Sequence, residues 1–195
     1  TTGEGSEGAV RPEYVMQVLD EILSEHDIMA VDASFSTNWV SAFLTSRRAG
    51  ARFVTPRGLA GLGWGFPMAL GAKLARPEAR VFCVAGDGGF AHCWAELETA
   101  KRMGIQVVTL VLNNQILGYQ KHGEDRVFGM HSDASELGPV DHAQIAEACG
   151  CLGIVVSSPG DLAGALQTAI EDERPAVIDV MTAEDAVPPL SMFAG

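Results

Sequence analysis

The chain has 195 residues, of which 47% are hydrophobic and 19% are charged, a composition that allows a globular domain with a sizeable core. Its net charge is −12, from 13 basic and 25 acidic residues, which argues against a nucleic-acid partner or an anionic membrane surface because both are bound by clustered Lys and Arg. The sequence shows no apolar run of the roughly 20 residues that span a bilayer, no secretory signal and too few cysteines for a disulfide framework, so we expect a cytoplasmic protein with no membrane partner.

Residues 1–10 begin without Met and are rich in Gly, Ser and Glu, which predicts a linker that leads into one domain over residues 11–195. The first half of that domain predicts, in order, a helix, a strand, a polar loop, an apolar segment, a short strand, a Gly-rich stretch and a helix. These elements cover residues 12–23, 28–31, 33–37, 39–44, 52–55, 57–65 and 67–75.

The second half of the domain alternates more regularly between strands and helices. Strands are predicted over 81–85, 105–112, 154–156 and 176–181, and helices over 90–102, 141–149 and 161–170, with a long Gly- and charge-rich segment over 113–139. Continuous apolar strands separated by amphipathic helices predict an α/β fold, a doubly wound parallel sheet with helices on both faces.

Two consecutive strand ends carry unusual chemistry: Gly86-Asp87-Gly88-Gly89 after one strand, and Asn113-Asn114 after the next. One helix links these strands, so they should run parallel and both turns should open on the same edge of the sheet. A carboxylate and an amide oxygen together suit Mg²⁺, while glycine N–H groups and the following helix N-terminus suit phosphate oxygens. Either motif alone is usually an ordinary turn, but the pair at this spacing predicts a magnesium-bridged diphosphate site.

The segment over residues 86–114 is similar to the cofactor signature of thiamine-diphosphate enzymes, which consists of Gly-Asp-Gly, a helix, a hydrophobic strand and Asn-Asn. The stretch over 58–72 resembles the one that precedes this signature in acetolactate synthases and benzoylformate decarboxylases. Residues 31–36 take the place of the first diphosphate-contacting loop of that group. Roughly residues 11–182 follow its C-terminal, diphosphate-binding domain.

The resemblance implies the roles of individual residues. Mg²⁺ would be bound by the Asp87 carboxylate, the Asn114 side chain and the Ile116 carbonyl. Leu62 would prop the cofactor in a bent conformation, although it also suits an ordinary core position. The residues implied to contact thiamine diphosphate are Ser34, Ser36, Gly61, Leu62, Gly86, Gly88, Gly89, Phe90, Ile116, Leu117 and Gly118.

The family's activating glutamate lies on a pyrimidine-binding domain that this sequence does not contain. No catalytic residue is assigned here, because Glu96 and Glu98 follow the cofactor turn on a helix and are expected to be structural or solvated. The resemblance therefore implies a partner, either a pyrimidine-binding domain on a longer chain or a separate subunit. It also implies a homo-oligomer, dimeric or tetrameric, with FAD possible in a missing middle domain.

Three positions bear on specificity. Gly123 stands where acetolactate synthases often have Trp, and Ser34-Phe35-Ser36 stands where they usually have Gly-Gln-His. His122 lies in the segment that tends to cover the active centre, where an imidazole can shuttle protons, but a surface role is the simpler interpretation. His92 either positions the diphosphate or faces solvent.

These observations predict the cofactor-binding domain of a 2-keto acid carboligase or decarboxylase, in which thiamine diphosphate serves as the electron sink for decarboxylation. One alternative is the small subunit of a split 2-keto acid decarboxylase. Another is a non-catalytic nucleotide-binding module, which would require Gly-x-Gly-x-x-Gly after the strand over 28–31. That motif is not found there.

Overall fold

The computed structural model describes residues 3–5, 8–49 and 52–190 and shows a six-stranded parallel sheet in the order β2-β1-β3-β4-β6-β5. The strands are β1 (Ile28–Val31), β2 (Phe53–Val54), β3 (Val81–Gly86), β4 (Val108–Asn113), β5 (Leu152–Val156) and β6 (Ala176–Met181). The predicted neighbours β3 and β4 pair in parallel, with Gly86 opposite Leu112. Both predicted turns therefore open on one edge of the sheet.

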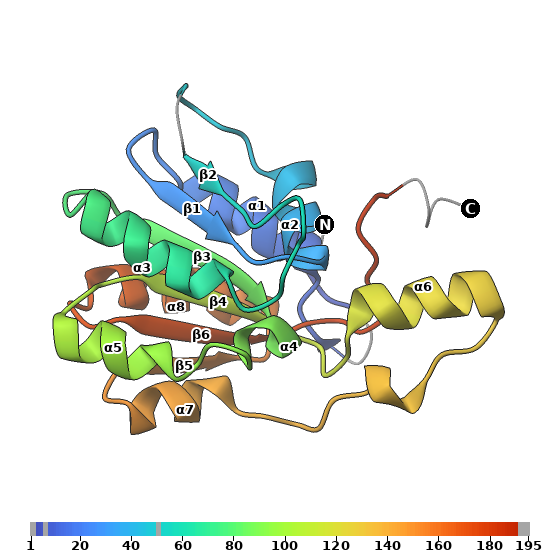
Figure 1. Cartoon of the computed structure of the whole chain (residues 1–195). Coiled ribbons are helices and arrows are strands. Elements are labelled where there is room, and N and C mark those ends of the chain that lie inside the picture. The colour runs from blue at the N-terminus through green and yellow to red at the C-terminus, as the bar shows by residue number, and fades with distance from the viewer. Residues whose placement is uncertain (1–2, 6–7, 50–51, 191–195) are drawn as a thin grey trace.

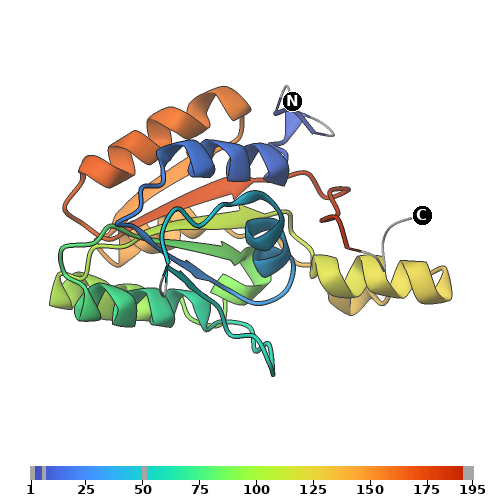
Figure 2. The same ribbon diagram turned by 90° about the horizontal axis from the view of Figure 1, so that it is seen from above.

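Helices cover both faces of the sheet, as Figure 2 shows, with α1 and α8 on one side and α3 and α5 on the other. The helices are α1 (Pro12–Ile22), α2 (Phe35–Phe43), α3 (Gly65–Ala75), α4 (Asp87–Phe90), α5 (Glu96–Met103), α6 (Gly118–Phe128), α7 (His142–Ala148) and α8 (Pro159–Glu171), with a 3₁₀ turn, η2 (Asp133–Ser135). Successive residues of β1 point into opposite cores, with Met29 and Val31 on the α1 face and Ile28 and Ala30 on the α3 face. The predicted doubly wound fold is confirmed. Across the described residues, no helix combines the length and apolar character needed to cross a membrane.

The prediction of a polar loop over residues 33–37 is wrong, because α2 begins at Phe35. Ser36 and Thr37 are buried in its first turn. The Thr37 hydroxyl donates a hydrogen bond of 2.6 Å to the Asp32 carbonyl. The first turn of α2 lies at the edge of the sheet, beside the cleft described in the next subsection. Small polar residues such as Ser36 and Thr37 fit at this position.

The predicted helix over 90–102 is in fact two shorter helices, α4 and α5, joined by a turn over residues 91–95. Tight hydrogen bonds form this turn, from His92 N–H to the Gly89 carbonyl and from Leu97 N–H to the Trp94 carbonyl. The segment that follows Gly88 and Gly89 is therefore a single turn, and its macrodipole is smaller than that of the long helix expected from the sequence.

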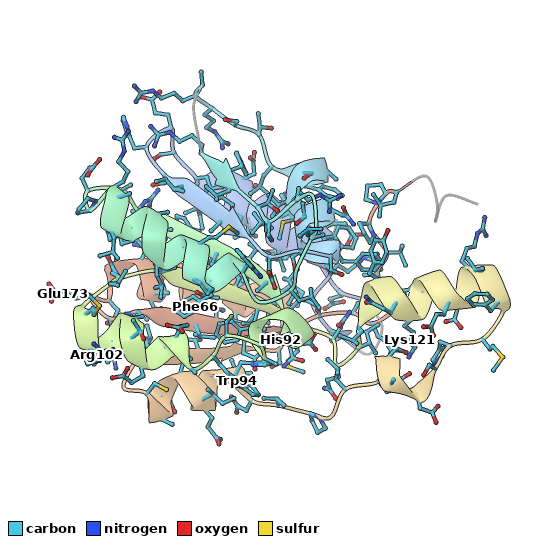
Figure 3. The ribbon with its side chains drawn as sticks, viewed as in Figure 1. Phe66, His92, Trp94, Arg102, Lys121 and Glu173 are labelled. Atoms are coloured by element: carbon cyan, nitrogen blue, oxygen red, sulfur yellow. The ribbon has the colours of Figure 1, made fainter. Side chains whose placement is uncertain are left out.

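The segment over 113–139, predicted to be irregular, contains α6 and η2. None of the residues of α6 is buried, and the helix projects beyond the carboxyl ends of the strands (Figure 1). Lys121, which lies on α6 (Figure 3), forms ion pairs with both Glu136 and Glu184. These ion pairs hold α6 against η2 and the chain segment after β6.

The predicted linker over 1–10 is described in part, since residues 1, 2, 6 and 7 lie outside the described residues, as do residues 191–195 at the other end. Val10 is fully buried, and its N–H donates to the Met181 carbonyl. The end of the predicted linker is thus packed against the domain.

An ion pair between the buried Asp27 carboxylate and the partly exposed Arg80 guanidinium, at the amino end of β1, gives a pH-dependent test of the fold. Burial of Asp27 opposes its ionisation, but hydrogen bonds from the Arg80 guanidinium and from Ser24 N–H outweigh this effect and hold the pKa of the carboxyl below its ordinary value. Because the folded-state pKa is lowered, the stabilisation exists above the unfolded-state pKa of about 3.9 and is lost as the pH falls through the folded-state pKa.

We therefore expect Asp27→Asn to lower the free energy of unfolding by about 2 kcal/mol near pH 7, and the deficit to shrink below about pH 4. Urea unfolding of both proteins across this range measures the difference. A deficit that stays constant or grows in acid would contradict the assignment.

Candidate functional site

A cleft of about 560 Å³, open solvent at its mouth included, lies at the carboxyl edge of the sheet. Four turns bring their residues to it: the β1–α2 turn, the Gly-rich stretch, the β3–α4 turn and the β4–α6 turn. The predicted site residues that line it are Ser34, Ser36, Leu62, Gly86, Asp87, Gly88, Gly89, Asn114, Ile116, Leu117 and Gly118. Predicted site residues from four separate segments of the sequence are therefore brought together at one edge of the sheet, where Pro12 and the segment after β6 complete the lining.

Asp87 is buried at the base of this cleft. Its Oδ1 accepts a hydrogen bond of 2.8 Å from Gly88 N–H, and its Oδ2 accepts one of 2.7 Å from Gln115 N–H. Burial raises the pKa of Asp87 to about 6, while the backbone donors oppose this rise. The second hydrogen bond ties the β3–α4 turn to the β4–α6 turn, so the two halves of the predicted metal site are joined directly.

The two asparagines have different roles in the fold. The Asn113 side chain is buried and donates to Asp179 Oδ1 at 3.0 Å and to the Val140 carbonyl at 3.1 Å, while His142 N–H donates to Asp179 Oδ2 at 2.8 Å. Asn114 lines the cleft beside Asp87. Asn113 is thus held in the protein interior, and Asn114 is the asparagine available to a bound group.

The donor set fits a hard divalent cation. One buried carboxylate, one amide and the Ile116 segment provide oxygen ligands of the kind that Mg²⁺ prefers, with water or phosphate filling other positions. Across the described ranges, no three His, Cys, Asp or Glu side chains gather in a metal-binding group. A cation at Asp87 would therefore also be bound by amide and carbonyl oxygens and by the oxygens of a bound phosphate group.

Two helix N-termini open on the cleft without a capping side chain. Ser34 precedes α2 and Leu117 precedes α6, and neither side chain caps its helix. Uncapped N–H groups and the helix dipole make such termini favourable sites for anions. The cleft therefore combines an oxygen-rich cation site with groups that attract phosphate.

Glycine is required by close packing at two positions of the β3–α4 turn. A Cβ at Gly88 would lie 2.6 Å from Leu117 Cδ2, and a Cβ at Gly89 would collide with the Asp32 carboxylate. The same Gly89 Cβ would lie 3.7 Å from Leu62 Cδ2. The turn is thus pressed against the neighbouring walls of the cleft.

Two predicted contact residues do not line the cleft. Gly61 faces the Trp64 indole, where a Cβ would lie 3.1 Å from Nε1. The Phe90 side chain is fully buried and packs edge-on against Phe66 and His142, with ring centroids 5.6 and 5.7 Å away. The Phe90 ring therefore belongs to the core under α4 and not to the cleft.

Comparison with known proteins agrees with this geometry. Residues 32–180 match the family described as thiamine pyrophosphate enzyme, C-terminal TPP binding domain, where thiamine pyrophosphate is another name for thiamine diphosphate. The chain belongs to this family. The predicted resemblance to thiamine-diphosphate enzymes is confirmed.

Two relatives show how much of a longer protein this chain matches. The putative thiamine pyrophosphate-containing protein YdaP of Bacillus subtilis is 33% identical over 181 residues, which cover 93% of this chain and 31% of the relative. The acetolactate synthase large subunit of Haemophilus influenzae is 33% identical over 163 residues, which cover 83% of this chain and 28% of that subunit. The chain thus spans about a third of the length of these relatives.

A solved structure confirms the fold. The thiamine diphosphate-dependent 4-hydroxybenzoylformate decarboxylase of Rhodococcus jostii RHA1 superposes with a TM-score of 0.86 at 22% identity, covering 94% of this chain and 34% of that one. The parallel sheet and its helical layers are therefore those of the TPP-binding α/β fold.

Ser34 adopts an unusual backbone conformation in this TPP-binding domain, with φ 71° and ψ −146°. This region is populated mainly by glycine, and a residue with a Cβ pays about 1–3 kcal/mol to occupy it. We expect Ser34→Gly to raise the free energy of unfolding by about 1 kcal/mol, because the relief of strain exceeds the entropic cost of glycine. Urea unfolding tests this, and a loss of stability would show that the Ser34 backbone is not strained.

The two histidines and two glutamates considered in the sequence lie outside the cleft. They are His92, His122, Glu96 and Glu98. His122 stacks on Phe35 with ring centroids 6.0 Å apart and lies 3.1 Å from the Glu184 carbonyl. His92 is exposed in the turn after α4, near Trp94 (Figure 3). Glu98 is exposed and pairs with Arg102 one helical turn later.

Two buried carboxylates, Asp32 and Asp179, hold segments that line the cleft and are not among the predicted site residues. Asp32 accepts hydrogen bonds from the Gly-rich stretch, and Asp179 holds Asn113. Their partners are more than 30 residues away along the chain, so no local pattern reveals them. The only sequence signal is a charged residue at the end of one apolar strand and within another.

Proposed function

We propose that this domain holds the diphosphate of thiamine diphosphate through Mg²⁺ in an acetolactate synthase-like enzyme that acts on a 2-keto acid. The observation that carries the proposal is the hydrogen bond from Gln115 N–H to Asp87 Oδ2, which joins the two predicted metal-binding turns at the base of the cleft. In this arrangement the Asp87 carboxylate, the Asn114 side chain and the Ile116 carbonyl bind the cation.

The charge of the cleft supports a metal-bridged diphosphate. The described residues that line it include no Lys or Arg, and among them Asp87 is the only charged side chain. A diphosphate placed there needs a cation to offset its repulsion with Asp87, and Mg²⁺ commonly binds through one carboxylate plus substrate phosphates. The N-termini of α2 and α6 supply the remaining attraction for phosphate oxygens.

The apolar wall of the cleft supports a role in holding the rest of the cofactor. Leu62, Ile116 and Leu117 line the same cleft as Asp87. Leu62 stands beside Gly89 and is the residue that would support the bent cofactor conformation. When bound, thiamine diphosphate supplies an electron sink for cleavage next to a keto group, and the chain's own residues anchor, orient and shield it.

The acetolactate synthase relatives support a 2-keto acid as the substrate class. The family resemblance supports a pyrimidine-binding domain as the partner. The cofactor-activating glutamate is proposed to come from a pyrimidine-binding domain, on a longer chain or a second subunit, with the site formed between copies in a dimer or tetramer. The departures at Gly123 and at Ser34-Phe35-Ser36 favour a keto acid or acceptor other than that of the usual acetolactate synthases.

Calorimetry tests the proposal directly. Thiamine diphosphate is titrated into the protein, together with its pyrimidine-binding partner, in the presence of Mg²⁺ and again with a chelator. We expect saturable binding with Mg²⁺ and a large loss of affinity without it. Absence of binding in the complete assembly with Mg²⁺ would overturn the proposed function.

A further inference from the structure

Asp32 is a carboxylate buried at the end of β1, with 1% of its surface exposed. Its Oδ2 accepts a hydrogen bond of 3.0 Å from Gly63 N–H, and its Oδ1 accepts bonds of 3.1 Å from both Trp64 and Gly65 N–H. Three consecutive amides of the Gly-rich stretch thus converge on one carboxylate. Burying a charge is costly unless it is hydrogen-bonded, so these three bonds explain how Asp32 is tolerated.

The backbone of Asp32 is fixed as firmly as its side chain. Its N–H donates to the Val84 carbonyl of β3 at 2.8 Å, and its carbonyl accepts the Thr37 hydroxyl of α2. Gly65 is the first residue of α3, so the Asp32 carboxylate also caps that helix from a different element. Asp32 therefore connects β3, α2 and α3 through hydrogen bonds that fix both its backbone and its side chain.

The position of Leu62 depends on the hydrogen bonds of Asp32. Leu62 directly precedes Gly63, the first of the three amides that Asp32 holds. On its other side the carboxylate abuts Gly89, where a Cβ would collide with Oδ2 and would lie 3.7 Å from Leu62 Cδ2. Asp32 thus fills the space between the Gly-rich stretch and the β3–α4 turn, and it sets how closely Leu62 approaches that turn.

We infer that Asp32 is a positioning residue, which fixes Leu62 against the cofactor turn and so sets the conformation in which thiamine diphosphate is held. This inference rests on the proposed function. Asp32 does not line the cleft and acts through the Gly63–Gly65 amides rather than by touching the cofactor. Its effect should fall on cofactor reactivity, because displacement of a reacting group by about 1 Å can cost about 100-fold in rate.

Asp32→Asn is the main test, since asparagine keeps the size of the side chain but places an NH₂ group opposite an amide donor. In the protein without cofactor, hydrogen exchange at the Gly63, Trp64 and Gly65 amides should become faster. In the holoenzyme, exchange of the thiazolium C2 proton for deuterium should slow by about 10- to 100-fold. Affinity for Mg²⁺ with inorganic pyrophosphate, which lacks the thiazolium, should stay within about 3-fold.

Asp179→Asn is the matched control, because Asp179 is also a buried carboxylate but holds Asn113, the neighbour of the proposed metal ligand Asn114. We expect it to raise the Mg²⁺ concentration needed for pyrophosphate binding and to leave exchange at the Gly63–Gly65 amides at the wild-type rate. Faster exchange at these amides in Asp179→Asn would overturn the inference, because the effect would then be general loosening. Where Asp32→Asn does not fold, Asp32→Ser takes its place, since serine keeps one oxygen acceptor.

A double-variant comparison decides whether Asp32 acts through Leu62. If it does, Asp32→Asn combined with Leu62→Ala slows C2 exchange no more than the slower single variant, whereas independent effects would multiply. Multiplied effects, or C2 exchange in Asp32→Asn within about 2-fold of wild type, overturn the inference. Failure of the wild-type assembled protein to bind thiamine diphosphate overturns the proposed function instead. The two failures are therefore distinguishable.

Discussion

In calorimetry with Mg²⁺, Asp87→Ala lowers the affinity for thiamine diphosphate by at least about 100-fold, equivalent to about 2.7 kcal/mol. The reason is that no other charged side chain lines the cleft in the part of the chain that the structure describes, so the loss of Asp87 removes the negatively charged ligand of the proposed cation site. It also leaves Gln115 N–H without its acceptor, which separates the two turns that form the site.

Two controls sharpen this prediction. With a chelator present, the large difference in cofactor affinity between wild type and Asp87→Ala should disappear, because the metal-dependent contribution is then absent from both proteins. Glu98→Ala removes an exposed carboxylate from α5, outside the cleft, and should leave affinity unchanged. An Asp87→Ala variant with wild-type, Mg²⁺-dependent affinity would show that the cation binds elsewhere.

Gly89→Ala should destabilise the protein by about 3 kcal/mol and abolish cofactor binding at ordinary concentrations. The new methyl group would collide with the Asp32 carboxylate. That carboxylate cannot move aside without giving up its three hydrogen bonds to Gly63, Trp64 and Gly65. Overpacking and the exposure of unpaired buried groups therefore act together.

Gly71→Ala is the matched substitution, because Gly71 lies within α3 and a Cβ there would meet no atom within 4 Å. Alanine should stabilise this helix by up to about 1 kcal/mol through its higher helix propensity. Urea unfolding of both variants gives the comparison. If Gly89→Ala were as stable as wild type, the contact between the β3–α4 turn and Asp32 would be looser than the structure shows.

The sheet could be predicted from the sequence because its strands are continuous apolar runs. Strands such as β3 and β4 are buried on both faces, and their boundaries differ from the prediction by only a few residues. The order of Gly86-Asp87-Gly88 and Asn113-Asn114 along the chain then placed both motifs at one sheet edge. Composition and periodicity were sufficient for this part of the fold.

The three errors in helix prediction have physical causes. Helix α6 has no buried residue, so it carries no apolar stripe that a periodic pattern can reveal. The first turn of helix α2 contains buried polar residues, Ser36 and Thr37, whose residue types are more typical of a loop. The break between α4 and α5 contains neither Gly nor Pro, so nothing in the sequence marks it.

The site could be predicted only where its residues form local motifs. Asp87 and Asn114 belong to such motifs, and the structure brings both to the cleft. Asp32 and Asp179 contact partners 31–33 and 37–66 residues away, so their roles depend on the folded arrangement. Local sequence patterns thus locate the groups proposed to touch the ligand and miss the groups that hold them in place.

The most direct test of the account is a crystal structure of the assembled enzyme grown with thiamine diphosphate and Mn²⁺ in place of Mg²⁺, with anomalous scattering used to locate the metal. The account predicts one anomalous peak bound to the Asp87 carboxylate, the Asn114 side-chain oxygen, the Ile116 carbonyl and the cofactor diphosphate. A metal peak away from these three residues, or a cofactor diphosphate bound outside this cleft, would contradict it.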